Sequence, residues 1–245
     1  MNQPGVPIDM LIRSKYIVLV FAAFSLCGAG GAWCSPGPAG SAAFIKGDVA
    51  VEREGRRNVL RQGDEVLEDD TIRTGTDSAA EIVLVDQTRF RIAENTSLEI
   101  TEYRYDPAEK VRYGLLSLMY GKARFAVHRF EEFADTRFRV QTRTALVGSR
   151  DTDFIVVSRR EAARDCVCRE GLVEALCLEH AILVFGTDFI DQPVLLIPDM
   201  ISQVCGPNLP TPPRFVTPAE RASILQGLEQ MESAPELRSG SPEAQ

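Results

Sequence analysis

Residues 81–100 read EIVLVDQTRFRIAENTSLEI. Three short runs in this stretch, 81–85, 89–92 and 98–100, are apolar or alternate between apolar and polar residues, and the residues between them favour turns. Alternation with a period of two is typical of a β-strand that buries one face. The stretch therefore predicts three successive strands joined by short turns.

The same pattern extends over residues 43–205. Further strand-like runs lie at 49–51, 138–140, 154–157, 172–173 and 194–197. This region sustains no long helical period, although LLSLMY at 115–120 fits either a buried strand or a single helical turn. We expect an all-β domain of short strands, arranged as a sandwich, a barrel or a solenoid-like fold.

The chain changes character after Cys205. Residues 206–216 are rich in proline, which removes a sheet donor, and predict a stiff linker. A capping box, Thr217-Pro-Ala-Glu220, predicts one short C-terminal helix over residues 217–232. Its apolar face is expected to dock on the β domain through Ile224, Leu225, Leu228 and Met231. The polar residues 233–245 predict a disordered tail.

The N-terminus carries a targeting signal. Arg13 and Lys15 precede an apolar run at 16–26, which small residues follow up to Ala32. This order predicts a secretory signal peptide over residues 1–32. Because residues 16–33 reach the lower limit for a spanning helix, roughly 17 residues, an uncleaved inner-membrane anchor is the alternative. In both cases we expect the β domain in the periplasm or cell envelope.

The balance of charges excludes some functions. The 245 residues include 27 Lys and Arg, 35 Asp and Glu and two His, for a formal net charge of −8. Such an acidic chain is not expected to bind nucleic acid, and two histidines cannot form a His-rich metal site. We predict no catalytic residues, no metal and no cofactor. The enzymatic alternative is a hydrolase using two carboxylates among Glu68, Asp69, Asp70, Glu131, Glu132, Asp151 and Asp153.

One region departs from the acidic balance. Residues 122–160 hold nine basic and five acidic residues. Arg137, Arg139 and Arg143 alternate with apolar or uncharged residues, so one face of a strand is predicted to be basic. With Arg150 they are the candidate residues for binding an acidic envelope protein or an anionic glycan. An ordinary solvated face is the alternative.

Four cysteines lie well inside the exported part of the chain: Cys166, Cys168, Cys177 and Cys205. An even number in an oxidising compartment predicts two disulfides, with the pairing left open. Cys166 and Cys168 are poor partners for each other, because side chains two residues apart on a strand are at the edge of disulfide reach. Tetrahedral zinc is the alternative, although the spacing lacks the usual C-x2-C pairs.

Residues 47–154 resemble the FecR domain family of bacterial envelope proteins. The first half of the resemblance rests on Gly47-Asp-Val49, Leu60-Arg-Gln-Gly63-Asp64-Glu-Val66, Ile72-Arg-Thr74-Gly75, Ser78-Ala79-Ala80 and Asn95-Thr-Ser97-Leu98. The second half rests on residues 140–154, VQTRTALVGSRDTDF, in which Gly148 and Thr152 occupy family positions. Arg143 and Asp151 replace a proline and a glycine of the family pattern.

The motif residues also have a physical role. Gly63, Gly75 and Gly148 are expected at positive φ in tight turns, and Asp64 is expected to cap its turn. Asn95, Thr96 and Ser97 are expected to bind nearby backbone groups. Gly47, Thr74 and Thr152 complete the set of turn residues. These are motifs of construction rather than of catalysis.

The resemblance implies a periplasmic all-β module. In well-known members this module follows a cytoplasmic anti-sigma region and relays the state of an outer-membrane transporter. Only 15 residues precede the apolar run here, so the sigma-factor role is not expected to carry over. We expect a non-catalytic envelope module that binds a protein or glycan, or alternatively a membrane-tethered sensory subunit.

Overall fold

The computed structural model describes residues 37–131, 133, 135–149, 151–160, 168 and 171–229. The predicted signal peptide or anchor, Arg150, Cys166, Met231 and the tail from residue 233 lie outside these residues. Within the described part, no helix is long and apolar enough to cross a membrane.

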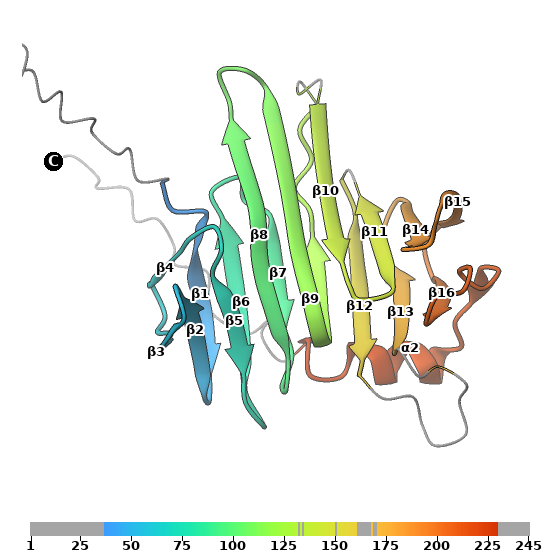
Figure 1. Ribbon diagram of the computed structural model, residues 1–245, viewed down its shortest axis with the longest axis horizontal. Coiled ribbons are helices and arrows are strands. Elements are labelled where there is room, and N and C mark those ends of the chain that lie inside the picture. Colours follow the sequence, from blue (N-terminus) through green and yellow to red (C-terminus); the bar gives the residue numbers. More distant parts are fainter. Residues whose placement is uncertain are drawn as a thin grey trace, which may run out of the picture. The chain divides into compact units, whose positions relative to one another are not determined.

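The regular secondary structure of the described chain is almost entirely β, as expected (Figure 1). Its first half consists of β1 (Gly40–Lys46), β2 (Val49–Arg53), β3 (Arg56–Val59), β4 (Glu65–Val66), β5 (Thr71–Thr74), β6 (Ala79–Leu84), β7 (Arg89–Ile92) and β8 (Ser97–Asp106). The remainder consists of β9 (Val111–Ala126), β10 (Asp135–Gln141), β11 (Ala145–Ser149), β12 (Asp153–Arg159), β13 (Leu172–Cys177), β14 (Ile182–Gly186), β15 (Phe189–Leu196), β16 (Met200–Cys205), β17 (Arg214–Phe215) and the helix α2 (Pro218–Leu225).

The strands form two sheets that share β9. Sheet A has the order β4-β1-β6-β7-β9-β12-β13-β16-β17. Sheet B has the order β3-β2-β5-β8-β9-β10-β11-β14-β15. Every pairing is antiparallel except that of β9 with β10. The ambiguous run at 115–120 is thus a strand, inside the 16-residue β9.

β9 changes sheets at Gly121. Up to Tyr120 the strand pairs with β8 in sheet B, and from Gly121 onward it pairs with β12 in sheet A. Gly121 has φ +100, and an added Cβ would lie 2.5 Å from Thr96 Cα. Only glycine meets both requirements without strain.

The two halves of β9 fold back on each other. Sixteen residues of extended chain span about 50 Å, yet Arg112 Nη1 lies 2.7 Å from the carbonyl oxygen of His128. The end of β9 therefore returns close to its beginning. This reversal lets β10 start beside Val111 and run parallel to β9, as Figure 1 shows.

The inner faces of the two sheets enclose one hydrophobic core. Phe125 of β9 is at its centre, with ring centroids 5.2 Å from Phe154 and 6.3 Å from Phe90 in sheet A. Phe138 of sheet B lies 6.2 Å from the same ring. On β10 the buried Phe138 and Val140 alternate with Arg137 and Arg139, which is the pattern that predicted this strand, whereas several outward residues of β9 are apolar.

Helix α2 packs on the outer face of sheet A, as predicted. Leu225 and Leu228 join Ile155, Val157, Leu176 and Ile201 in a second, smaller apolar cluster. The capping box is present, because Thr217 Oγ1 accepts from Glu220 N and Glu220 Oε2 accepts from Thr217 N. The helix ends at Leu225, earlier than predicted, because Gln226 is extended and Gly227 has φ +82.

The expected linker lies against the β domain. Thr211 N donates to Gln203 O at 2.9 Å, and Arg214–Phe215 pairs with β16 as an edge strand. An edge position suits this segment, since its prolines precede the paired residues and remove no ladder donor.

Candidate partner-binding surface

The predicted basic strand is β10. Phe138 and Val140 are fully buried in the core, whereas Arg137 is exposed and Arg139 is half-buried. The alternation of the strand therefore places both arginines on the outer face of sheet B. Arg143 follows in the turn after β10 and is exposed. Arg150 lies outside the described residues.

Arg139 belongs to a row of outward residues that crosses five strands. In register with it are Leu115 on β9, Gly148 on β11, Leu183 on β14 and Leu195 on β15. Leu183 is 39% exposed and Leu195 is 55% exposed. We call these five residues the outer row. It combines one positive charge with an exposed apolar strip, the composition found at protein-binding surfaces.

The charge on this face changes from strand to strand. On β8, Glu102 is opposite Leu115 and Glu99 is opposite Ser117. Two strands further along the sheet, Arg137 and Arg139 reverse the sign. The outer face of β8 also carries Arg104, opposite Tyr113, so this face passes from mixed charge at β8 through basic at β10 to apolar at β14 and β15.

The family-motif glycines are only partly turn residues. Gly47 has φ +74 and Gly63 has φ +88, and Asp64 Oδ2 accepts from Arg61 N at 2.7 Å, as expected of a capped turn. Gly75 and Gly148 do not have positive φ, so that prediction is wrong for both. Gly148 lies within β11, and Gly75 N donates to Asp48 O at 2.8 Å.

The motif around Asn95 supports the corner of β9. Asn95 has φ +51, and Thr96 Oγ1 accepts from Lys122 N at 3.0 Å. Thr74 Oγ1 accepts from Thr96 N and donates to Ala93 O, which ties β5 to the same turn. The expected bond from Ser97 is not made, because its buried hydroxyl has no partner within the described chain.

Thr152 plays a similar structural part. Its hydroxyl is hydrogen-bonded to that of Ser149, and Thr152 O accepts from Val127 N at 2.9 Å. These contacts join the turn before β12 to the residue after β9. Thr74, Thr96 and Thr152 therefore hold neighbouring strands in place.

One disulfide joins Cys168 to Cys205, with Cα atoms 5.1 Å apart. Cys177 is a free thiol, fully buried opposite Phe154, and its Sγ donates to Glu179 O. The prediction of two disulfides among the four cysteines is therefore wrong. Cys177 points from β13 into the core, where it packs as a small apolar residue.

A buried ionic cluster escaped the sequence analysis. Arg112 and Asp86 have no solvent-exposed side-chain surface, and Arg112 Nη1 lies 3.4 Å from Asp86 Oδ2. Asp86 also accepts from Thr88 N and Thr88 Oγ1, both at 2.9 Å. Burial lowers the pKa of Arg112, and burial together with Asp86 raises that of Tyr103. The alternation of β9 was the available signal, because position 112 shares the inward face with Leu116 and Leu118.

Several of the acidic residues considered for catalysis have structural roles. Arg53 binds Asp70 with two hydrogen bonds of 2.7 Å, and Arg124 binds Asp153 at 2.6 Å. Asp151 lies 3.3 Å from Arg129. In the described ranges no three metal-ligating side chains come together.

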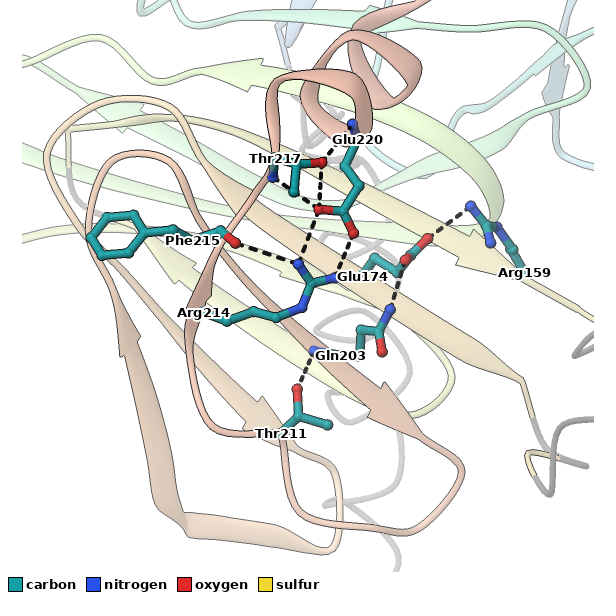
Figure 2. A network of polar contacts seen from close by, with 8 residues as sticks. All are labelled: Arg159, Glu174, Gln203, Thr211, Arg214, Phe215, Thr217 and Glu220. Atoms are coloured by element: carbon teal, nitrogen blue, oxygen red, sulfur yellow. Dashed lines mark hydrogen bonds and ion pairs between the residues drawn. The ribbon is translucent and has the colours of Figure 1, made fainter.

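Gln203 N of β16 donates to Thr211 Oγ1 at 2.9 Å, which joins the C-terminal segment to sheet A, and further polar contacts lie on either side of this bond (Figure 2). Arg214 donates to both carboxylate oxygens of Glu220, at 2.8 and 3.1 Å, and this pairing with the Thr217 cap lowers the pKa of Glu220 to about 2. Glu174 on β13 contacts Arg159 at 2.8 Å and Gln203 at 2.9 Å.

A hollow of about 600 Å³ remains beside the helix, where Lys122 Nζ donates to Gln226 O at 2.6 Å.

Comparison with known protein families finds a match to part of the described domain. Residues 70–174 match the family described as FecR protein, which confirms the resemblance over those residues. The matched segment runs from Asp70, before β5, to Glu174 in β13, so it includes the corner of β9 and the basic strand β10. No curated protein is significantly similar to this chain.

Two solved structures are similar to the chain. Both are crystal structures of a proposed anti-sigma factor from Parabacteroides distasonis ATCC 8503, at 1.65 and 2.50 Å resolution, with 20% sequence identity and a TM-score of 0.46. Each similarity covers 64% of this chain, and 65% and 64% of the two solved chains. The chain thus spans less than two thirds of the length of those chains.

Proposed function

We propose that this protein is a non-catalytic, exported module of the cell envelope, of the FecR type, that binds a protein partner through the outer face of sheet B. The family match over residues 70–174 supports a signalling-related envelope module. The outer row is the observation that carries the binding role, because it places Arg139 in one register row with exposed Leu183 and Leu195, two and three strands away.

The positive charge and the apolar surface on the outer face of sheet B together indicate the chemistry of the partner. Arg137 and Arg139 attract a negatively charged surface, and the leucines of the outer row require apolar side chains next to it. An acidic protein surface with apolar residues meets both conditions. A glycan offers negative charge without the same apolar area, so a glycan partner is the less favoured outcome.

Charge reversal on β10 tests the binding surface. A variant carrying Arg137→Glu and Arg139→Glu should lose its cross-linked partner in the native envelope, since both replacements repel an acidic surface. The matched control carries Arg56→Glu and Arg57→Glu on β3, two exposed residues at the far edge of the same sheet. Partner capture that is equal in wild type and in both variants would refute the proposal.

Export is tested separately by the mass of the envelope-associated protein. Cleavage after Ala32 gives a mature chain that begins at Trp33 and carries a net charge one unit more negative than the full chain, because the removed residues hold two bases and one acid. A full-length mass would favour the membrane-tethered alternative, with residues 16–33 as the anchor.

A further inference from the structure

A second hollow, of about 500 Å³, opens at the end of the domain where β10 turns into β11 and β12 ends. Its walls carry three arginines, Arg143, Arg159 and Arg160, and no acidic residue is among the described residues that line it. In a chain with a formal net charge of −8, such a concentration of positive charge is unusual. We call this hollow the arginine pocket.

The three arginines differ in how they are held. Arg159 contacts Glu174 at 2.8 Å, so its charge is largely balanced. Arg160 stacks on Tyr120, with its guanidinium carbon 3.5 Å from the ring centroid. Stacking fixes the plane of the guanidinium and leaves its N–H edges available to an acceptor. Arg143 also lines the pocket and is exposed. Arg143 and Arg160 therefore carry the positive charge that is available to a ligand.

A buried hydroxyl supports a ligand at the same place. Thr144 lines the pocket and is only 2% exposed, and its Oγ1 makes no hydrogen bond within the described part of the chain. Buried hydroxyls are nearly always paired, and because Oγ1 of Thr144 has almost no accessible surface, a ligand in the pocket bonds to it only if the wall shifts. An oxyanion supplies acceptors for both a hydroxyl and guanidinium groups.

The pocket is continuous with the proposed binding surface. Ser117 on β9 and Gln141 on β10 line the pocket and pair with each other in the sheet. They are two residues along their strands from Leu115 and Arg139, at the next outward position. Met119, on the pocket wall, is 51% exposed and adds apolar surface at the rim. A peptide that crosses the outer face of sheet B thus reaches the pocket without leaving the protein surface.

We propose that the arginine pocket binds the carboxylate side chains of an acidic peptide segment of the partner. A guanidinium group can bind a carboxylate with two parallel hydrogen bonds. A carboxylate therefore fits Arg143 and Arg160 better than an anion that offers only one acceptor atom. This inference rests on the proposed function, and it adds the chemical class of the segment that is recognised.

The test uses a labelled hexaglutamate peptide and the folded exported protein. Fluorescence anisotropy should show saturable binding at low salt, and the dissociation constant should rise at least tenfold when Arg143→Ala and Arg160→Ala are combined. The matched control combines Arg56→Ala and Arg57→Ala and should bind as the wild type does. Both pairs of arginines are exposed, so circular dichroism is expected to show folded protein in each case.

Three results would overturn the proposal. The first is equal affinity of the wild type and the pocket variant for hexaglutamate. The second is equal binding of hexaglutamine, or equal weakening in the Arg56 and Arg57 control, because either indicates unspecific attraction. The third is tighter binding of citrate than of hexaglutamate, which would assign the pocket to a small free carboxylate.

The two proposals fail in different ways. If the pocket variant loses hexaglutamate while charge reversal at Arg137 and Arg139 leaves partner capture unchanged, the pocket stands and the outer-face function falls. If charge reversal abolishes capture while the pocket variant binds hexaglutamate as the wild type does, the function stands and the pocket assignment falls.

Discussion

Arg112 and Asp86 form an ion pair, 3.4 Å apart, in which neither side chain is accessible to solvent. The pair joins the start of β9 to the turn between β6 and β7, and Arg112 also donates to His128 O in the segment that returns the chain to β10. Phe130, whose ring lies 5.5 Å from the guanidinium carbon of Arg112, shields the cluster further. The interior of the domain therefore holds a charged side chain together with its counter-charge.

Replacing Arg112 should be among the most damaging single changes. Arg112→Met leaves the Asp86 carboxylate buried without its cation, and we expect a loss of about 3–5 kcal/mol in the free energy of unfolding, measured with urea. The control is Arg104→Met on the neighbouring β8, where the pair with Glu109 is exposed and should contribute less than about 1 kcal/mol. Similar small losses in both variants would show that the buried pair is unimportant.

Gly121 should tolerate no side chain. Gly121→Ala combines a strained positive φ with a Cβ that meets the backbone of Thr96, and should cost about 3 kcal/mol or more. Gly55 has φ +73 but no atom within 4 Å of its added Cβ, so Gly55→Ala should cost only about 1–2 kcal/mol. Thermal melts of the two variants check this; equal melting temperatures would mean that the corner of β9 is not tightly packed.

The disulfide should stabilise the second half of the domain. Cys168 and Cys205 are 37 residues apart, and closing a loop of that length contributes roughly 4 kcal/mol in the chain-entropy treatment. Cys205→Ser should lower the free energy of unfolding by up to that amount. Non-reducing peptide mapping should recover Cys168 joined to Cys205; a peptide with Cys177 in a disulfide would contradict the structure.

The buried thiol of Cys177 predicts a pH dependence of stability. Burial raises its pKa from 9.0 to about 11, so the unfolded chain loses this proton at lower pH than the folded chain does. Stability should therefore be unaffected below pH 9 and should fall between pH 9 and pH 11. From pH 9 to pH 10 the fall should be about 1 kcal/mol.

Cys177→Ala isolates this contribution in denaturant titrations at pH 8, 9 and 10. The variant should lose less stability over this range than the wild type. Tyr103, whose pKa is also raised by burial, is unchanged in both proteins and cancels in the comparison. Parallel pH curves for the two proteins would mean that Cys177 ionises as readily in the folded state as in the unfolded one.

The strands were predictable because their signal is local. The runs at 81–85 and 89–92 correspond to β6, at Ala79–Leu84, and β7, at Arg89–Ile92. The capping box also lies where the helix begins. The end of the helix was predicted too late, since apolar spacing continues to Met231 while the backbone leaves the helix at Gln226. The spacing of apolar residues indicates which residues are buried, but it does not indicate which backbone conformation buries them.

The basic face was partly predictable. Alternation alone put Arg137 and Arg139 on one side of a strand, and the structure agrees. Alternation does not reveal which strands flank β10, and so the sequence did not indicate that Leu183 and Leu195 continue the row from Arg139. Nor did the sequence indicate that Arg143 and Arg160 line one pocket, since Arg143 follows β10 of sheet B and Arg160 follows β12 of sheet A.

The sequence by itself determined the all-β class, the C-terminal helix and its start, and the alternation that makes β10 basic on one face. These properties depend on residues within a few positions of each other, where backbone geometry repeats with a fixed period. Only the tertiary structure decided the parallel placement of β10, the pairing of Cys168 with Cys205 and the burial of Arg112 against Asp86. Each of these follows from the reversal of β9 at Gly121 or from contacts between strands distant in sequence, and such contacts are selected by how the two sheets pack together rather than by any local pattern.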